Sequence, residues 1–140
     1  MPLDEILVDS GFLYALYDRD DEDNADASAV AELYSGKFII PYVVLTEVAY
    51  LFRRAGDVRA VVRFLDALVK GNYQFEIVSP GDLTRARDIM VQYADAKLDF
   101  VDCCIMALSE RLNITQVCTL DQRDFNIFRP KHCPYLEIMP

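Results

Sequence analysis

The chain has 140 residues, of which 53% are hydrophobic and 26% are charged, and its formal net charge at pH 7 is −9. This length and composition predict one compact globular domain over residues 1–140 and exclude a disordered chain. The negative charge argues against broad, non-specific binding to nucleic acid, which depends on Lys and Arg side chains that neutralise phosphates. It does not exclude an enzyme that cleaves nucleic acid.

Short apolar runs alternate with helical segments from the start of the chain. Residues 6–9 predict a buried strand that leads directly into a helix. An acidic loop at residues 18–23 separates this helix from a second one. Asn24 or Asp26 would cap the second helix, and Gly36 would end it.

The same alternation continues to the C-terminus. Further strands are expected at residues 37–40, 75–79 and 114–120, with a candidate fifth at 135–139, and helices at residues 42–55, 58–70, 82–94 and 100–112. Asp57 and Asp99 are placed to cap the helices that follow them. Because alternating strands and helices are joined by right-handed crossovers, the predicted fold is a three-layer α/β/α sandwich. Its central sheet would be mainly parallel, with about four to five strands.

Four carboxylates occupy positions that such a fold would bring together. Asp9 and Asp121 close predicted strands, and the carboxyl ends of parallel strands line the ligand crevice of an open sheet. Glu47 and Asp102 lie in apolar helical stretches, where an unpaired charge is costly. Converging carboxylates without a cation would raise at least one pKa and reduce stability. Because oxygen ligands favour Mg²⁺ or Mn²⁺ over zinc or copper, the pattern predicts a divalent-metal hydrolase.

Each of these carboxylates also has a structural alternative. The neighbours of Glu47 one turn away on its helix are apolar, so its side chain either points inward or lies at the edge of the apolar stripe. Asp99 is as well placed to cap the helix that carries Asp102 as to act as a ligand. Asp124 could likewise cap a helix. Asp9, like Asp121, could simply end a strand in a turn.

Other catalytic devices are weak or missing in the sequence. His132 is the only histidine, so a Ser-His-Asp arrangement would need a long-range coincidence. The four cysteines form no Cys-x-x-Cys pair, and we expect them to be buried, reduced thiols. No Gly-x-Gly-x-x-Gly sequence follows the first strand, and there is no Walker A sequence.

The acidic positions stand in a recognisable order. Ile-Leu-Val-Asp-Ser at residues 6–10 is followed by Thr-Glu at 46–47, Leu-Asp-Phe-Val-Asp at 98–102 and Thr-Leu-Asp at 119–121. In this order the chain resembles the PIN-domain ribonucleases, especially the VapC-type toxins of type II toxin–antitoxin pairs. The likeness runs nearly end to end, and the late block around residues 93–112 is its most specific part.

The resemblance implies a metal-dependent endoribonuclease that uses Mg²⁺ or Mn²⁺ to cleave single-stranded RNA and leaves a 5′-phosphate and a 3′-hydroxyl. Carried over by position, the catalytic and metal-binding residues would be Asp9, Glu47, Asp102 and Asp121, with Ser10, Asp99 and Asp124 as accessory residues and Arg53, Arg54 and Arg123 as contacts to RNA or a partner. Such chains often carry a His in the early loop, where this one has Asn24. This difference leaves the metal site intact but would change how a substrate approaches.

An antitoxin protein and a second copy of the chain are the partners that the resemblance implies, and an apolar face on the helices at residues 42–70 could bind them. Two alternatives stay open: an RNA-processing PIN nuclease without a toxin role, and a catalytically silent PIN-like binding module. The N-terminal Met-Pro-Leu-Asp-Glu lacks the basic region and apolar core of a signal peptide. No apolar run approaches the ~18 to 20 residues that a membrane span needs. We therefore expect a soluble, cytoplasmic protein without membrane contact.

Overall fold

A computed structural model describes residues 5–140 and shows a sheet of five parallel strands in the order β3-β2-β1-β4-β5. The strands are β1 (Ile6–Val8), β2 (Phe38–Pro41), β3 (Gln74–Glu76), β4 (Gln116–Cys118) and β5 (Glu137–Met139). The prediction of an α/β fold with a mainly parallel sheet is confirmed, including the fifth strand. Most strands are shorter than predicted because only three or four residues of each form the ladder of backbone hydrogen bonds.

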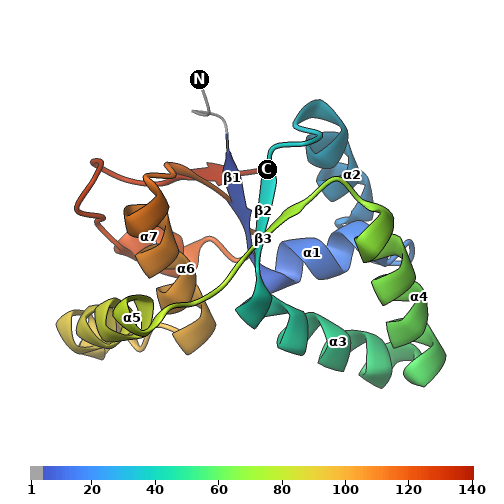
Figure 1. Ribbon diagram of the computed structural model, residues 1–140, viewed down its shortest axis with the longest axis horizontal. Coiled ribbons are helices and arrows are strands. Elements are labelled where there is room, and N and C mark those ends of the chain that lie inside the picture. The colour runs from blue at the N-terminus through green and yellow to red at the C-terminus, as the bar shows by residue number, and fades with distance from the viewer. Residues whose placement is uncertain (1–4) are drawn as a thin grey trace.

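Helices cover both faces of this sheet. They are α1 (Ser10–Tyr17), α2 (Asn24–Leu33), α3 (Tyr42–Gly56), α4 (Val58–Lys70), α5 (Pro80–Gln92), the short 3₁₀ helix η1 (Ala94–Ala96), α6 (Phe100–Leu112) and α7 (Arg123–Ile127). Helices α1 to α4 lie on one side of the strands, and α5 to α7 lie on the other (Figure 1). The sheet is therefore the middle layer of three, as the alternation of strands and helices predicts.

The core is centred on β1 and α6. Every residue of β1 is buried, and so is the run Cys103–Ser109 of α6. Both read as nearly continuous apolar runs, which is typical of elements covered on both sides. Three of the cysteines, Cys103, Cys104 and Cys118, are free and buried in this core, so the expectation of buried thiols is confirmed for them. Asp9 directly follows β1, and Asp102 lies in the first turn of α6, so the buried core fixes the positions of both residues.

Some details of the helices differ from the predictions. Helix α2 begins at Asn24 itself, with Asp23 at the cap position and without a capping bond from its side chain. The Asn24 side-chain amide instead donates to the carbonyl oxygens of Ala15 (2.8 Å) and Leu16 (3.1 Å), at the end of α1. Helix α7 was not predicted, because five residues are too few to show a helical period.

Helix α4 carries apolar side chains on two of its faces. Ala60, Phe64 and Leu68 are buried against the rest of the protein. A second stripe is exposed to solvent and consists of Val58, Val62, Leu65 and Val69.

Within residues 5–140, no helix is both long enough and apolar enough to cross a membrane. The prediction about the N-terminal segment falls mainly on residues 1–4, outside the described residues.

Candidate functional site

The order of the strands reverses next to β1. From β1 the chain adds β2 and β3 on one side, whereas β4 and β5 lie on the other. Val8 at the end of β1 pairs with Cys118 at the end of β4, and the backbone N–H of Asp9 donates to the carbonyl oxygen of Cys118 at 3.1 Å. Ligands of open α/β sheets bind outside the carboxyl ends of the strands at such a point.

A cleft of about 890 Å³ opens at this place. Its lining contains six carboxylates, from Asp9, Glu47, Asp99, Asp102, Asp121 and Asp124, together with Ser10, Gly11, Thr46, Tyr50, Leu51 and Leu120. The four carboxylates predicted as site residues and all three accessory residues therefore lie around one cleft. None of these lining residues is a Lys or an Arg. Among the ion pairs of the described residues, only the one between Arg123 and Asp124, at 2.8 Å, involves a carboxylate of the cleft, so the other five carboxylates have no cationic partner.

Asp9 has two roles at the head of helix α1. Its side chain is only 6% exposed and accepts a hydrogen bond from the backbone N–H of Phe12 at 2.9 Å, so it caps the helix. Burial, reinforced by the nearby charges of Asp121 and Glu47, raises the pKa of the Asp9 carboxyl to about 6. Capping alone would favour the charged form, so this raised pKa reflects first the burial of Asp9 and then its acidic neighbours.

Glu47 lies at the edge of the apolar face of α3, which packs inward through Val44, Val48 and Phe52. Its side chain is half-buried and lines the cleft. The hydroxyl of Ser10 donates to Oε1 of Glu47 at 2.5 Å. This hydrogen bond links the start of α1 to α3 and orients the Glu47 carboxylate beside Asp9. The edge position and the place in the cleft are thus both correct for Glu47.

Asp99, Asp102 and Asp124 lie together at the start of α6, whereas Asp121 is exposed three residues after β4. Asp99 caps this helix by accepting from the backbone N–H groups of Val101 (3.0 Å) and Asp102 (3.3 Å). Asp124 is buried and accepts the backbone N–H of Asp99 at 3.1 Å; it does not cap α7, whose cap position is Gln122. The capping alternative is therefore correct for Asp99 and wrong for Asp124.

Asp102 is the most perturbed carboxyl of the cleft. Burial is the largest cause, and a hydrogen bond with Asp124 and the charges of Asp9 and Asp99 act in the same direction. Together they raise the pKa of Asp102 well above its usual range. Asp102 therefore holds its proton more readily than an exposed aspartate does.

The donor set fits a hard divalent cation. All six acidic residues of the cleft offer carboxylate oxygens, the ligands that Mg²⁺ and Mn²⁺ prefer. Across the described part of the chain, however, no three His, Cys, Asp or Glu side chains are arranged as a finished metal site. Because unneutralised carboxylates repel one another, a cation would have to draw these side chains closer together.

Comparison with known proteins identifies the family of the chain that carries this cleft. A model of the PIN domain matches residues 6–129, which is most of the chain. The chain belongs to the PIN-domain family. No curated protein gives a significant match to the sequence. The predicted likeness to PIN domains is thereby confirmed.

Several solved structures resemble this PIN domain, and those named here are toxins or toxin–antitoxin complexes. VapC20 from Mycobacterium tuberculosis, a sarcin-ricin loop cleaving toxin, is 20% identical with a TM-score of 0.82, over 97% of this chain and 100% of that one. A toxin–antitoxin complex from Klebsiella pneumoniae is 20% identical with a TM-score of 0.70, over 94% and 99%. VapBC2 from Rickettsia felis, bound to a DNA fragment from its promoter, is 13% identical with a TM-score of 0.71, over 95% and 96%. At these identities the likeness shows a shared fold.

The basic residues that were expected to contact RNA lie outside the lining of the PIN-domain cleft. Arg53 and Arg54 are exposed in the last turn of α3. Arg123 pairs with Asp124 at 2.8 Å and donates to the carbonyl oxygen of Ala96 at 2.5 Å, so it ties α7 to η1. One lining residue, Tyr50, was not predicted, although its position three residues after Glu47 places it on a neighbouring part of the same helix surface.

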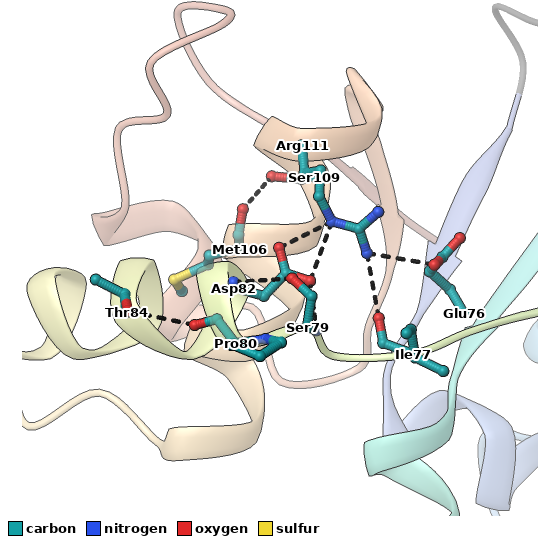
Figure 2. A network of polar contacts seen from close by, with 9 residues as sticks. All are labelled: Glu76, Ile77, Ser79, Pro80, Asp82, Thr84, Met106, Ser109 and Arg111. Atoms are coloured by element: carbon teal, nitrogen blue, oxygen red, sulfur yellow. Dashed lines mark hydrogen bonds and ion pairs between the residues drawn. The ribbon is translucent and has the colours of Figure 1, made fainter.

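A second polar cluster of this PIN domain lies away from the cleft, between α5 and α6 (Figure 2). Arg111 on α6 donates to both carboxylate oxygens of Asp82 on α5, at 2.9 and 3.0 Å, and to Glu76 at the end of β3, at 3.2 Å. Asp82 also forms a capping box with Ser79. Burial alone would raise the pKa of Asp82, but the hydrogen bonds from Arg111 and Ser79 outweigh it and hold that pKa below its usual range. The cluster joins α5, α6 and the end of β3, and it gives the buried Asp82 a cationic partner.

Proposed function

We propose that this PIN domain is a Mg²⁺- or Mn²⁺-dependent endoribonuclease that hydrolyses phosphodiester bonds of single-stranded RNA. It would act in the cytoplasm as the toxin of a type II toxin–antitoxin pair. The observation that carries the proposal is the set of six carboxylates around one cleft at the switch point of the sheet, with no Lys or Arg in the lining. Asp9 is buried and Glu47 and Asp102 are half-buried without a cationic partner, whereas Asp121 is exposed at the rim. A scaffold gains nothing from burying unpaired carboxylates, because each one costs stability.

Asp9, Glu47, Asp102 and Asp121 are the residues that would hold the cation, with Asp99 and Asp124 behind them. When bound, a divalent cation supplies positive charge that lowers the pKa of a water and neutralises the phosphate. Ser10 orients Glu47 through its hydroxyl, and Asp124 fixes the first turn of α6 through the N–H of Asp99. Asp102 would give up its proton to solvent as it becomes a ligand.

Control by a partner protein is part of the proposal. The exposed apolar stripe of α4, made of Val58, Val62, Leu65 and Val69, is a surface that a partner would cover. The structures from Klebsiella pneumoniae and Rickettsia felis contain a toxin together with its antitoxin. An antitoxin is therefore the partner that we propose, and a second copy of this chain is a further one.

The activity can be tested with purified protein and a fluorescently labelled single-stranded RNA. We expect cleavage with Mg²⁺ or Mn²⁺, no cleavage with EDTA, and no cleavage by Asp9→Asn or Asp102→Asn. Asp66→Asn is the matched control, because this carboxylate is exposed on α4 outside the cleft. Titration of Mn²⁺ by calorimetry gives a readout that is independent of turnover, and both cleft variants should bind the ion more weakly than Asp66→Asn does.

The outcomes separate the remaining functions. Unchanged cleavage by both cleft variants would contradict the site, and no cleavage with any metal would favour a binding module. The toxin role needs an experiment in cells: expression should arrest growth, and co-expression of a neighbouring small open reading frame should relieve the arrest. RNA cleavage without growth arrest would favour an RNA-processing nuclease.

A further inference from the structure

Tyr50 is an exposed aromatic residue on the wall of the cleft. Its side chain is 63% exposed, which is unusual for a large ring beside a buried site. Among the aromatic contacts and hydrogen bonds of the described residues, none involves the Tyr50 ring or its hydroxyl. Packing within this chain therefore does not explain the position of Tyr50.

The chemistry of the cleft limits how its walls can contact RNA. The lining contains six carboxylates and no Lys or Arg, so the walls offer no positive charge to a phosphate backbone. Single-stranded RNA is commonly held through its bases, which stack on aromatic side chains. Tyr50 is the only aromatic residue in the lining. It is the one wall residue that can supply this uncharged contact.

The geometry of α3 puts Tyr50 between the site and a guanidinium. With 3.6 residues per turn, Arg54 lies within about 20° of the direction of Glu47 around the helix, and Tyr50 lies about 60° from Glu47. The rise along the axis is about 4.5 Å from Glu47 to Tyr50 and about 6 Å from Tyr50 to Arg54. Arg54 is exposed, and none of the ion pairs found in the described residues involves it. A carboxylate, a ring and a cation thus follow one another along the surface of α3.

We propose that Tyr50 is a positioning residue that stacks on a base next to the cleaved phosphodiester, and that Arg54 contacts the backbone phosphate beyond it. This inference rests on the proposed ribonuclease function and adds a determinant of substrate binding to it. Stacking needs the ring and not the hydroxyl, and it is indifferent to which base is present. Tyr50 would therefore set the path of the RNA strand rather than its sequence.

The kinetic test uses Tyr50→Leu, Tyr50→Phe and the control Tyr135→Leu. Tyr135 is matched in exposure, at 61%, and does not line the cleft. We expect Tyr50→Leu to raise KM for a short single-stranded RNA on the order of 10-fold with little change in kcat. Tyr50→Phe and Tyr135→Leu should behave as the wild type does. An unchanged KM in Tyr50→Leu, or an equal rise in Tyr135→Leu, would overturn the proposal.

A second test changes the RNA substrate and keeps the protein variants. An abasic nucleotide scanned through the RNA should, at one position, remove the difference between the wild type and Tyr50→Leu, and a scan without such a position would count against stacking. If the wild type does not cleave RNA at all, the proposed function fails and stacking must be read from binding. An oligoribonucleotide with a single 2-aminopurine should then lose fluorescence on binding to the wild type and Tyr50→Phe, but not to Tyr50→Leu. Equal fluorescence in all three complexes would overturn the stacking contact itself.

Discussion

Two buried aspartates of this protein lie in opposite electrostatic surroundings. Asp82 is 3% exposed, and its carboxylate accepts hydrogen bonds from the Arg111 guanidinium and from the backbone N–H of Ser79 within a capping box. Asp9 is 6% exposed and is surrounded by other carboxylates. The pKa of Asp82 is lowered, whereas burial and the acidic neighbours raise the pKa of Asp9. The exposed fractions of the two residues are thus nearly equal. Asp82 has a cationic partner that offsets the cost of burying its charge, and Asp9 has none, so the charge of Asp82 stabilises the fold and that of Asp9 does not.

The difference teaches which cluster serves stability and which serves function. The Asp82–Arg111 cluster joins β3, α5 and α6, and its charges are satisfied inside the chain (Figure 2). The cleft is left short of positive charge, and this shortage is what a ligand can supply. A site that is stable only when something binds it is a better candidate for function than one already complete.

The largest expected effect comes from exchanging one carboxylate in each cluster for its amide. Asp102→Asn should reduce RNA cleavage by more than about 100-fold. Replacing a residue that only supports a metal ligand costs up to about 100-fold, and Asp102 is itself a proposed ligand. In the absence of metal it should leave the free energy of unfolding unchanged or raise it, because at neutral pH the folded state disfavours the charged form of a carboxyl that is ionised in the unfolded chain. Urea denaturation and initial cleavage rates measure the two quantities. A variant that is both inactive and strongly destabilised would break the contrast.

The second prediction concerns pH. The folded-state pKa of Asp9 lies above its unfolded value of 3.8, so the group favours folding below that pH and ceases to do so as pH rises through about 6. Metal-free wild type should lose on the order of 3 kcal/mol of unfolding free energy across this window relative to Asp9→Asn, which keeps a capping side chain. Urea titrations at several pH values give the difference. Asp82 titrates in the opposite sense, because its lowered pKa makes stability fall as the solution becomes acidic below pH 3.8.

A third prediction reverses the first. Asp82→Asn removes the charge that Arg111 and the helix start require, so it should lower the free energy of unfolding by about 1 to 3 kcal/mol. Cleavage by the folded fraction should remain as in the wild type, since Asp82 does not line the cleft. Thermal denaturation together with cleavage rates below the melting temperature tests both parts. Loss of activity in fully folded Asp82→Asn would show that the clusters are coupled.

The smallest expected effect separates the two roles of Asp99. Asp99→Ala should lose about 1 kcal/mol of stability because the cap of α6 is removed. Asp99→Asn should retain most of that stability, because an asparagine oxygen can accept the same backbone N–H groups. If Asp99 serves only as a cap, Asp99→Asn should also retain cleavage. A fall in Mn²⁺ affinity of Asp99→Asn, measured by calorimetry, would instead place Asp99 among the residues that attract the cation.

The sequence predicted much of this arrangement because its signals are local. Asp9 and Asp121 follow apolar strands, and the carboxyl ends of parallel strands meet by geometry alone. Glu47 interrupts an apolar stripe, which is visible from helical spacing. These features need no knowledge of distant contacts. Convergence of the carboxylates was therefore predictable.

What could not be predicted depends on contacts between distant segments. Asp124 accepts the N–H of Asp99, 25 residues earlier, and Arg123 reaches the carbonyl of Ala96, 27 residues earlier. No sequence spacing encodes such pairs, so Arg123 was expected to contact RNA or a partner, and Asp124 was expected to be either an accessory site residue or a helix cap. Asn24 follows the same rule: Asn24 or Asp26 was expected to cap α2, but the Asn24 amide donates to the nearby end of α1.

The hydrogen bonds around Asp9 have a consequence for the cost of ordering its side chain. Its backbone N–H is held by Cys118 and its carboxylate by the N–H of Phe12, while Ser10 holds Glu47 in the same way. Two of the four proposed ligands thus lose their rotamer freedom during folding and not during binding. Such preorganisation increases affinity without adding any contact. Ser10→Ala would therefore weaken cation binding, although the Ser10 side chain is not itself a proposed ligand.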